Sequence, residues 1–183
     1  MNARETILNA LKKFREAPAD RLFFEKEPMR FDDLSEAFAT ALEAAGGEAV
    51  ETAEVSAEAI AGHFRFEGRI LDTRESGEAL SRRDGIGLVI VEGTFGVAEN
   101  GAVWIDPKER YPRELLTLAE NVAVVLKKGA IVATMHEAYE RIDFSDISYA
   151  LFMAGPSKTA DIEQALVIGA HGAIGMKVFL EGR

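Results

Sequence analysis

The stretch IGLVIVEGTFGVAENGAVWI, residues 86–105, contains the two clearest structural signals of the chain. Its first six residues are nearly all apolar and rich in β-branched side chains, as in a strand of a parallel sheet that is covered on both faces. Its second half places Asn100-Gly101 between two apolar runs, the strongest short signal for a β-hairpin. The stretch therefore predicts a buried strand over 86–91 followed by a hairpin.

Short apolar strands alternate with helical patterns on both sides of this stretch. We expect helices over 2–17, 32–45, 56–64, 113–120 and 134–142, and strands near Val50, Ile70-Leu71, 122–126, 130–133, 149–153 and 176–180. Such alternation with short connections is typical of the α/β class. The sequence predicts a layered α/β fold with a mostly parallel central sheet and one hairpin insertion.

Composition narrows the classes of function. The chain has 183 residues, a formal net charge of -10 and no cysteine. No basic stripe is visible, so we expect neither nucleic acid nor an anionic membrane surface as a partner. The lack of cysteine excludes disulfides, thiol nucleophiles and iron–sulfur clusters held by thiolates. The three histidines show no metal-ligand spacing, so we predict no metal site and no cofactor.

The sequence also lacks the signals of membrane insertion and export. Its longest run without Asp, Glu, Lys or Arg is the 13 residues from Gln164 to Met176, which is short of the roughly 18–20 needed to span a bilayer. Its first residues carry no apolar core of a signal peptide. We therefore expect a cytoplasmic location.

The segment after the strand at 149–153 is the best candidate for a binding site. We predict a helix from about Thr159 to Gly169. A helix start carries unpaired N–H groups and a partial positive charge, which favour an anion, and the Lys158 ammonium would add a full charge. The residues of this predicted site are Gly155, Pro156, Ser157, Lys158, Thr159 and Asp161, together with Gly172 and the Asn100-Gly101 turn.

A purely structural interpretation uses the same atoms. Ser157 or Thr159 can cap the helix, Asp161 can complement its dipole, and Lys158 can point into solvent. The residues alone leave both interpretations open.

Two residues are candidates for proton transfer or nucleophilic attack. His171 begins the turn into the last strand, and imidazole is suited to proton transfer near neutral pH, although a single histidine in a glycine-rich turn is more often structural. Glu99 flanks the hairpin turn, where a carboxylate can act as nucleophile or base when a cation or burial tunes it. More often such a residue is simply solvated.

Three segments resemble the lactate-utilisation protein C family, also called the LUD domain. AGPSKTADIEQALVIGAHG, residues 154–172, is similar to that family's Gly-Pro-Ser-Arg/Lys-Thr-Ala-Asp-Ile-Glu segment followed by Gly-x-His-Gly. VAENGAVWI, residues 97–105, resembles its Ala-Glu-Thr-Gly-Thr turn, and residues 113–126 resemble the segment that follows. Four residues depart from the family pattern: Asn100 and Ala102 stand where threonines are common, and Ala119 and Val122 where a proline and a histidine are often found.

The resemblance implies a three-layer α/β/α sandwich with a mostly parallel central sheet, like the sugar-phosphate isomerase and CoA-transferase group. It implies a single LUD-like domain over 32–183, preceded by an N-terminal helix and arm over 1–31. It also implies an accessory, cluster-free subunit of an iron–sulfur lactate-oxidation complex, with iron–sulfur proteins as partners and a carboxylate or phosphate on the 155–161 loop.

Two other functions remain as alternatives. The chain could be a stand-alone enzyme acting on a phosphorylated or CoA-linked acid, by analogy with the fold group. Lys158 and the neighbouring hydroxyls would then bind the anionic group, Glu99 would be nucleophile or base, and His171 would carry a proton. The chain could instead be a structural or regulatory partner whose loop is only a cap. Self-association into a homo-oligomer is also left open.

Overall fold

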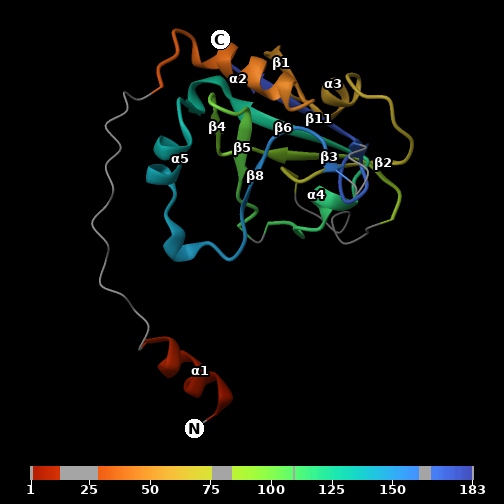
Figure 1. Cartoon of the computed structure of the whole chain (residues 1–183). Helices are drawn as coiled ribbons and strands as arrows, with labels where there is room; N and C mark the ends of the chain where they lie inside the picture. The colour runs from red at the N-terminus through yellow and green to blue at the C-terminus, as the bar shows by residue number, and fades with distance from the viewer. Residues whose placement is uncertain (1, 13–28, 76–83, 109, 161–165, 183) are drawn as a thin grey trace.

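A parallel five-stranded sheet forms the centre of the protein (Figure 1). The computed structural model describes residues 2–12, 29–75, 84–108, 110–160 and 166–182. The strand order is β1 (Glu48–Thr52), β11 (Gly175–Glu181), β6 (Asn121–Lys127), β3 (Ile86–Glu92) and β2 (Arg69–Asp72), and every neighbouring pair is parallel. The predicted mostly parallel sheet is confirmed.

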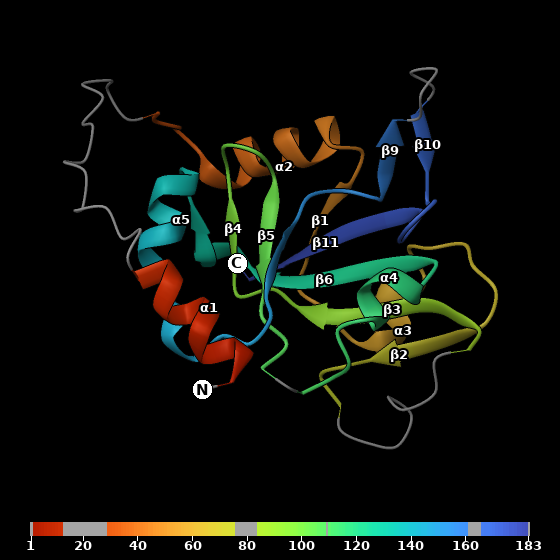
Figure 2. The same cartoon turned by 60° about the horizontal axis from the view of Figure 1, so that its bottom comes forward.

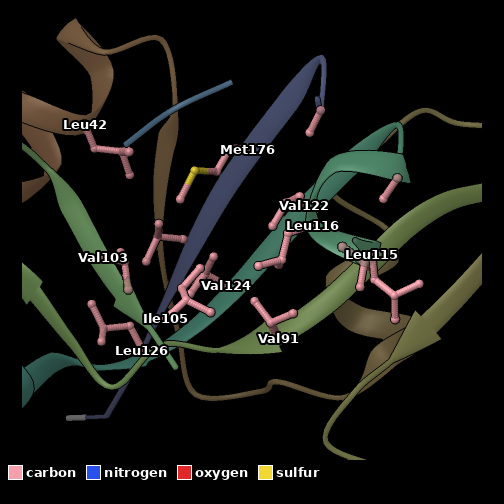
Figure 3. Close-up of a cluster of buried hydrophobic side chains, with 14 of the residues drawn as sticks. Leu42, Val91, Val103, Ile105, Leu115, Leu116, Val122, Val124, Leu126 and Met176 are labelled. Carbon is pink, nitrogen blue, oxygen red and sulfur yellow. The ribbon is translucent and has the colours of Figure 1, made fainter. Parts of the chain in front are cut away.

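Side chains of the central strands alternate between two buried faces. Leu88 and Ile90 of β3 join a cluster that α3 (Ala57–Ala61) covers through Ile60. Val89 and Val91 point to the other face, which is covered by α2 (Leu34–Ala44), α4 (Leu115–Leu118) and the β4–β5 hairpin (Figure 3). This double coverage explains why the strand sequences are almost continuously apolar. Helices on both faces agree with the predicted α/β sandwich.

The hairpin predicted at Asn100-Gly101 is confirmed, but it belongs to a larger second sheet. Strands β4 (Phe95–Val97) and β5 (Ala102–Ile105) pair antiparallel, with Val97 opposite Ala102. On the edges, β7 (Ile131–Val132) joins β4 and β8 (Leu151–Met153) joins β5. The outer face of this sheet packs against α5 (Met135–Arg141). The sequence predicted the hairpin alone, because it does not reveal which separate strands extend it.

Most predicted helix starts are confirmed by their caps. Asp33 caps α2, since its Oδ1 accepts N–H bonds from Ser35 (2.7 Å) and Glu36 (3.1 Å). The bond from Glu36, followed by that from Ser35, lowers the pKa of the Asp33 carboxyl below its ordinary value of 3.8. The hydroxyl of Thr134 caps α5 by accepting from the Glu137 N–H (3.3 Å). Such caps satisfy N–H groups that have no partner within the helix.

The N-terminal helix is confirmed over its described part, and the other predicted helices are shorter than expected. Helix α1 spans Ala3–Lys12, with Asn2 and Glu5 exchanging two bonds in a capping box. Short 3₁₀ turns, η2 (Lys128–Ala130) and η3 (Phe144–Asp146), follow β6 and α5. In the part of the chain that the structure describes, no helix is long and apolar enough to cross a membrane.

The helix predicted from Thr159 to Gly169 is wrong. Strands β9 (Lys158–Ala160) and β10 (Leu166–Ile168) form an antiparallel pair instead, with Lys158 opposite Ile168. Ser157 explains the difference, because its N–H donates to the Ala173 carbonyl (2.8 Å) and its carbonyl accepts from the Gly169 N–H (3.0 Å). These long-range bonds hold the segment extended, which also suits the β-branched Val167 and Ile168. Asp161 lies outside the described residues.

Candidate functional site

The loop at Gly155 packs against the end of helix α2. Gly155 is buried with a φ of 76°, and a methyl group at this position would overlap the carbonyl oxygen of Ala45. Only glycine adopts this conformation without strain at such a close approach. The space beside the Gly155 backbone, where a ligand was predicted to approach, is therefore filled by the end of α2. The helix start that was predicted to bind an anion is absent from the described part of this segment.

Lys158 completes the same contact with its side chain. Its Nζ donates to the carbonyl oxygen of Ala45, the residue that follows α2. Carbonyl groups at a helix C-terminus lack partners within the helix and carry a partial negative charge, so a lysine ammonium stabilises them. The Lys158 charge is thus engaged in capping α2.

We expect Lys158→Ala to lower the free energy of unfolding by about 0.3–1 kcal/mol, the usual contribution of a cation at an exposed helix C-terminus. Urea unfolding followed by far-ultraviolet circular dichroism measures this loss. Lys127→Ala serves as the control, because Lys127 is exposed at the end of β6 and should leave the midpoint nearly unchanged. Weaker, salt-sensitive phosphate binding in Lys158→Ala would instead identify the loop as an anion site.

The turn that contains Glu99 is tied to helix α5. The Glu99 carboxylate accepts the Met135 N–H (2.8 Å) at the first residue of α5, and the Glu99 N–H donates to the Ala133 carbonyl (3.0 Å). Asn100 holds the hairpin turn, since its Oδ1 accepts the Ala102 N–H (3.0 Å). Both side chains therefore have structural partners, with Glu99 acting as a second cap of α5.

The structure brings part of the predicted site together. Gly101 lies against the backbone of Leu42 in α2, and Gly155 lies against the backbone of Ala45, which directly follows α2. Strand β5 pairs with β8 beside them. Ser157 joins the loop to the His171-Gly172 turn through its bond to Ala173. Pro156 is half-buried beside Gly46, and Thr159 is described only by its backbone in β9.

The functional groups themselves point to different elements. Glu99 reaches α5, Lys158 reaches the end of α2, and His171 lines a separate cavity. Figure 2 shows α5 and the β9–β10 hairpin on opposite sides of the β4–β5 hairpin. Glu99 and His171 thus have different structural surroundings.

His171 lines a cavity of about 460 Å³ at the amino ends of the central strands. Its lining includes Ile86 at the start of β3, and Glu120 and Ile174 just before β6 and β11. Besides His171, the titratable side chains among its described lining residues are the carboxylates of Glu67 and Glu120, with no lysine or arginine. This cavity is therefore unsuited to an anion. Elsewhere, too, no three His, Asp or Glu residues of the described ranges are grouped to hold a metal ion.

A larger cavity of about 940 Å³ lies on the outer side of the second sheet, and we call it the Trp104 cavity. It is lined by Thr94, Phe95, Trp104, Asp106, Lys108, Arg141, Ile142, Asp143, Ser145, Ile147 and Ser148. The sequence does not reveal this cavity, because its walls come from two segments, 94–108 and 141–148, that only the fold brings together. The one feature of the sequence that could have pointed to this cavity is Trp104, the single tryptophan of the chain.

Comparison with known proteins adds a family and a fold. Residues 57–180, more than half of the chain, match the model of the LUD domain family. A protein named lactate utilization protein C from Shouchella clausii is 28% identical over 108 residues, covering 56% of this chain and 47% of that protein. One of the same name from Geobacillus thermodenitrificans is 31% identical over 93 residues, covering 48% of this chain and 38% of that protein.

A solved structure supports the fold alone. The crystal structure of a DUF162 family protein from Deinococcus radiodurans superposes with a TM-score of 0.61 at 16% sequence identity. The superposition covers 85% of this chain and the whole of the Deinococcus chain. The matches cover less than half the length of the lactate utilization proteins C from Shouchella clausii and Geobacillus thermodenitrificans.

Proposed function

We propose that this chain, which belongs to the LUD domain family, takes part in lactate utilisation as an accessory, anion-binding subunit of an iron–sulfur lactate-oxidation complex. The observation that carries the proposal is its similarity to proteins named lactate utilization protein C. The chain has no cysteine, so it cannot hold an iron–sulfur cluster through thiolates. In such a complex its part is assembly or ligand binding.

The contacts of the predicted catalytic groups favour this accessory role over a stand-alone enzyme. A carboxylate nucleophile needs access to a substrate and a neighbouring group that tunes it. The Glu99 carboxylate instead accepts the Met135 N–H at the start of α5. The Lys158 ammonium, which would bind the anionic part of a substrate, is bonded to the end of α2.

Affinity capture tests the accessory role. We expect the tagged chain, captured from its native cells grown on lactate, to co-purify with iron–sulfur proteins. These are identified by equal molar contents of iron and inorganic sulfide. A tagged protein of similar charge and size, expressed in the same cells, is the control for nonspecific capture. Recovery of the tagged chain without any iron–sulfur protein would contradict the proposal.

A further inference from the structure

We propose that the Trp104 cavity binds an organic monocarboxylate with an apolar body. The carboxylate lies at Arg141 and Lys108, and the apolar body lies against Phe95 and Trp104. This assignment rests on the anion-binding role in the proposed function and gives that role a site and a class of ligand. The cavity volume of about 940 Å³ falls in the range of small-molecule sites, roughly 300–1,000 Å³.

The position of the cavity in the fold suits a ligand. Thr94 lies two residues beyond the carboxyl end of β3, a strand of the central parallel sheet. Asp106 directly follows β5 of the second sheet. In open parallel sheets, ligands usually bind outside the carboxyl ends of the strands. The cavity that contains His171 lies at the opposite, amino end.

Aromatic side chains form a fixed wall. Phe95 and Trp104 are opposite each other in the β4–β5 ladder, and their rings stack with centroids 6.3 Å apart and an interplanar angle of 17°. Phe152 of β8 supports Trp104 from the neighbouring strand, at 4.7 Å between ring centroids. Because these rings are already held in place by their neighbours, their side chains lose little conformational entropy when a ligand binds against them.

The cations at the rim are available, whereas the carboxylates are engaged. Asp106 Oδ1 accepts the Lys108 N–H (3.0 Å), and Asp143 Oδ1 accepts the Ser145 N–H (2.9 Å). Hydrogen bonds from the Ser145 side chain and then its backbone lower the pKa of Asp143, so this carboxyl stays ionised at neutral pH. Within the described ranges, neither the Arg141 guanidinium nor the Lys108 ammonium pairs with a carboxylate.

The two cations and two carboxylates at the rim of the cavity favour a ligand with a single negative charge. Asp106 and Asp143 share the rim with the two cations, so a phosphate with two negative charges would meet more repulsion than a carboxylate with one. Arg141 has a structural role as well, because it lies in the last turn of α5 and complements the helix dipole there.

Tryptophan fluorescence of the full chain reports binding without a label, because Trp104 is the single tryptophan and lines the cavity. We expect 3-phenylpropionate to change the emission and bind more tightly than propionate, since its ring buries additional apolar area. The uncharged 3-phenylpropionamide and inorganic phosphate should bind at least tenfold more weakly. Equal affinity for the acid and its amide, or tighter binding of phosphate, would overturn the proposal.

Two variants separate the site from a general charge effect. We expect Arg141→Gln to weaken 3-phenylpropionate binding about tenfold, as the loss of a charge-assisted hydrogen bond implies. Arg65→Gln removes the same charge from an exposed residue of the α3–β2 loop and should leave affinity unchanged. Equal effects of the two substitutions, with unchanged urea midpoints, would refute the site.

The outcomes also distinguish this site from the accessory role. If iron–sulfur partners are captured but 3-phenylpropionate does not bind, the site is wrong and the subunit role stands. If the carboxylate binds at Arg141 but no iron–sulfur protein is captured, the subunit role fails and the site stands.

Discussion

Gly101→Ala is expected to lower the free energy of unfolding by about 2–5 kcal/mol. Gly101 closes the β4–β5 hairpin with a φ of 68° and is buried against α2. A residue with a side chain loses about 1–2 kcal/mol in this left-handed conformation. The new methyl group would also overlap the backbone of Ala41 and Leu42, and displacing packed structure costs about 1–3 kcal/mol more.

Two other glycines separate these contributions in urea unfolding experiments. Gly85 has a φ of 60° but no atom within 4 Å of an added methyl group, so Gly85→Ala measures the conformational strain alone. Gly129 has neither the positive φ nor a close neighbour, and Gly129→Ala should be nearly neutral. A loss for Gly101→Ala no larger than that for Gly85→Ala would show that the contact between hairpin and α2 is not tight.

Phe179→Ala should lower the free energy of unfolding by about 3–5 kcal/mol, the usual loss for a buried aromatic side chain. Phe179 is 1% exposed on β11, between β1 and β6. Its ring contacts His63 edge-on at 5.3 Å and Phe64 at 6.3 Å between ring centroids. The substitution would open a void beneath α3, where no other strand side chain of the cluster is aromatic.

Phe144→Ala is the matched control, because it removes the same ring from a side chain that is 58% exposed. We expect it to lower the free energy of unfolding by less than about 1 kcal/mol. Chemical denaturation of both variants, with the slope against urea checked for change, makes the comparison. Similar losses would contradict the assignment of Phe179 to the core.

The central sheet could be predicted from the sequence because its signals are local. Buried strands such as 86–91 require apolar side chains on both faces, and this leaves a continuous apolar run. The cap at Asp33 and the turn at Asn100-Gly101 depend on neighbours two or three residues away. Such short-range chemistry is visible in the order of the residues.

The segment after Gly155 could not be predicted in the same way. Ser-Lys-Thr-Ala-Asp suits a helix start, but serine, threonine and aspartate also form turns and extended connections by bonding to nearby backbone. The bond from Ser157 to Ala173 decides between these structures. It depends on where the last strand lies, which the local sequence does not contain.

Contacts between distant parts of the chain also explain why Lys158 and Glu99 have partners that the sequence did not predict. Lys158 bonds to a carbonyl 113 positions earlier in the chain, and Glu99 to an N–H 36 positions later. Lys158 was predicted to bind an anion or to point into solvent, and Glu99 to act as nucleophile or base or to be solvated. Each instead bonds to backbone at the end of a helix that is distant in the sequence. The Trp104 cavity needed the same information, because two distant segments form it.

The position of β11 has a consequence for the order in which the protein folds. The last strand inserts between β1 and β6, and Lys177 on β11 bonds to Glu48 on β1 across 129 positions. During synthesis, β1 must therefore wait until β11 has been made before it finds its partner, and the apolar side chains of β1 stay accessible until then. Contacts so distant in sequence slow folding. A nascent chain released before β11 emerges would expose two strand edges, and strand edges of this kind favour aggregation.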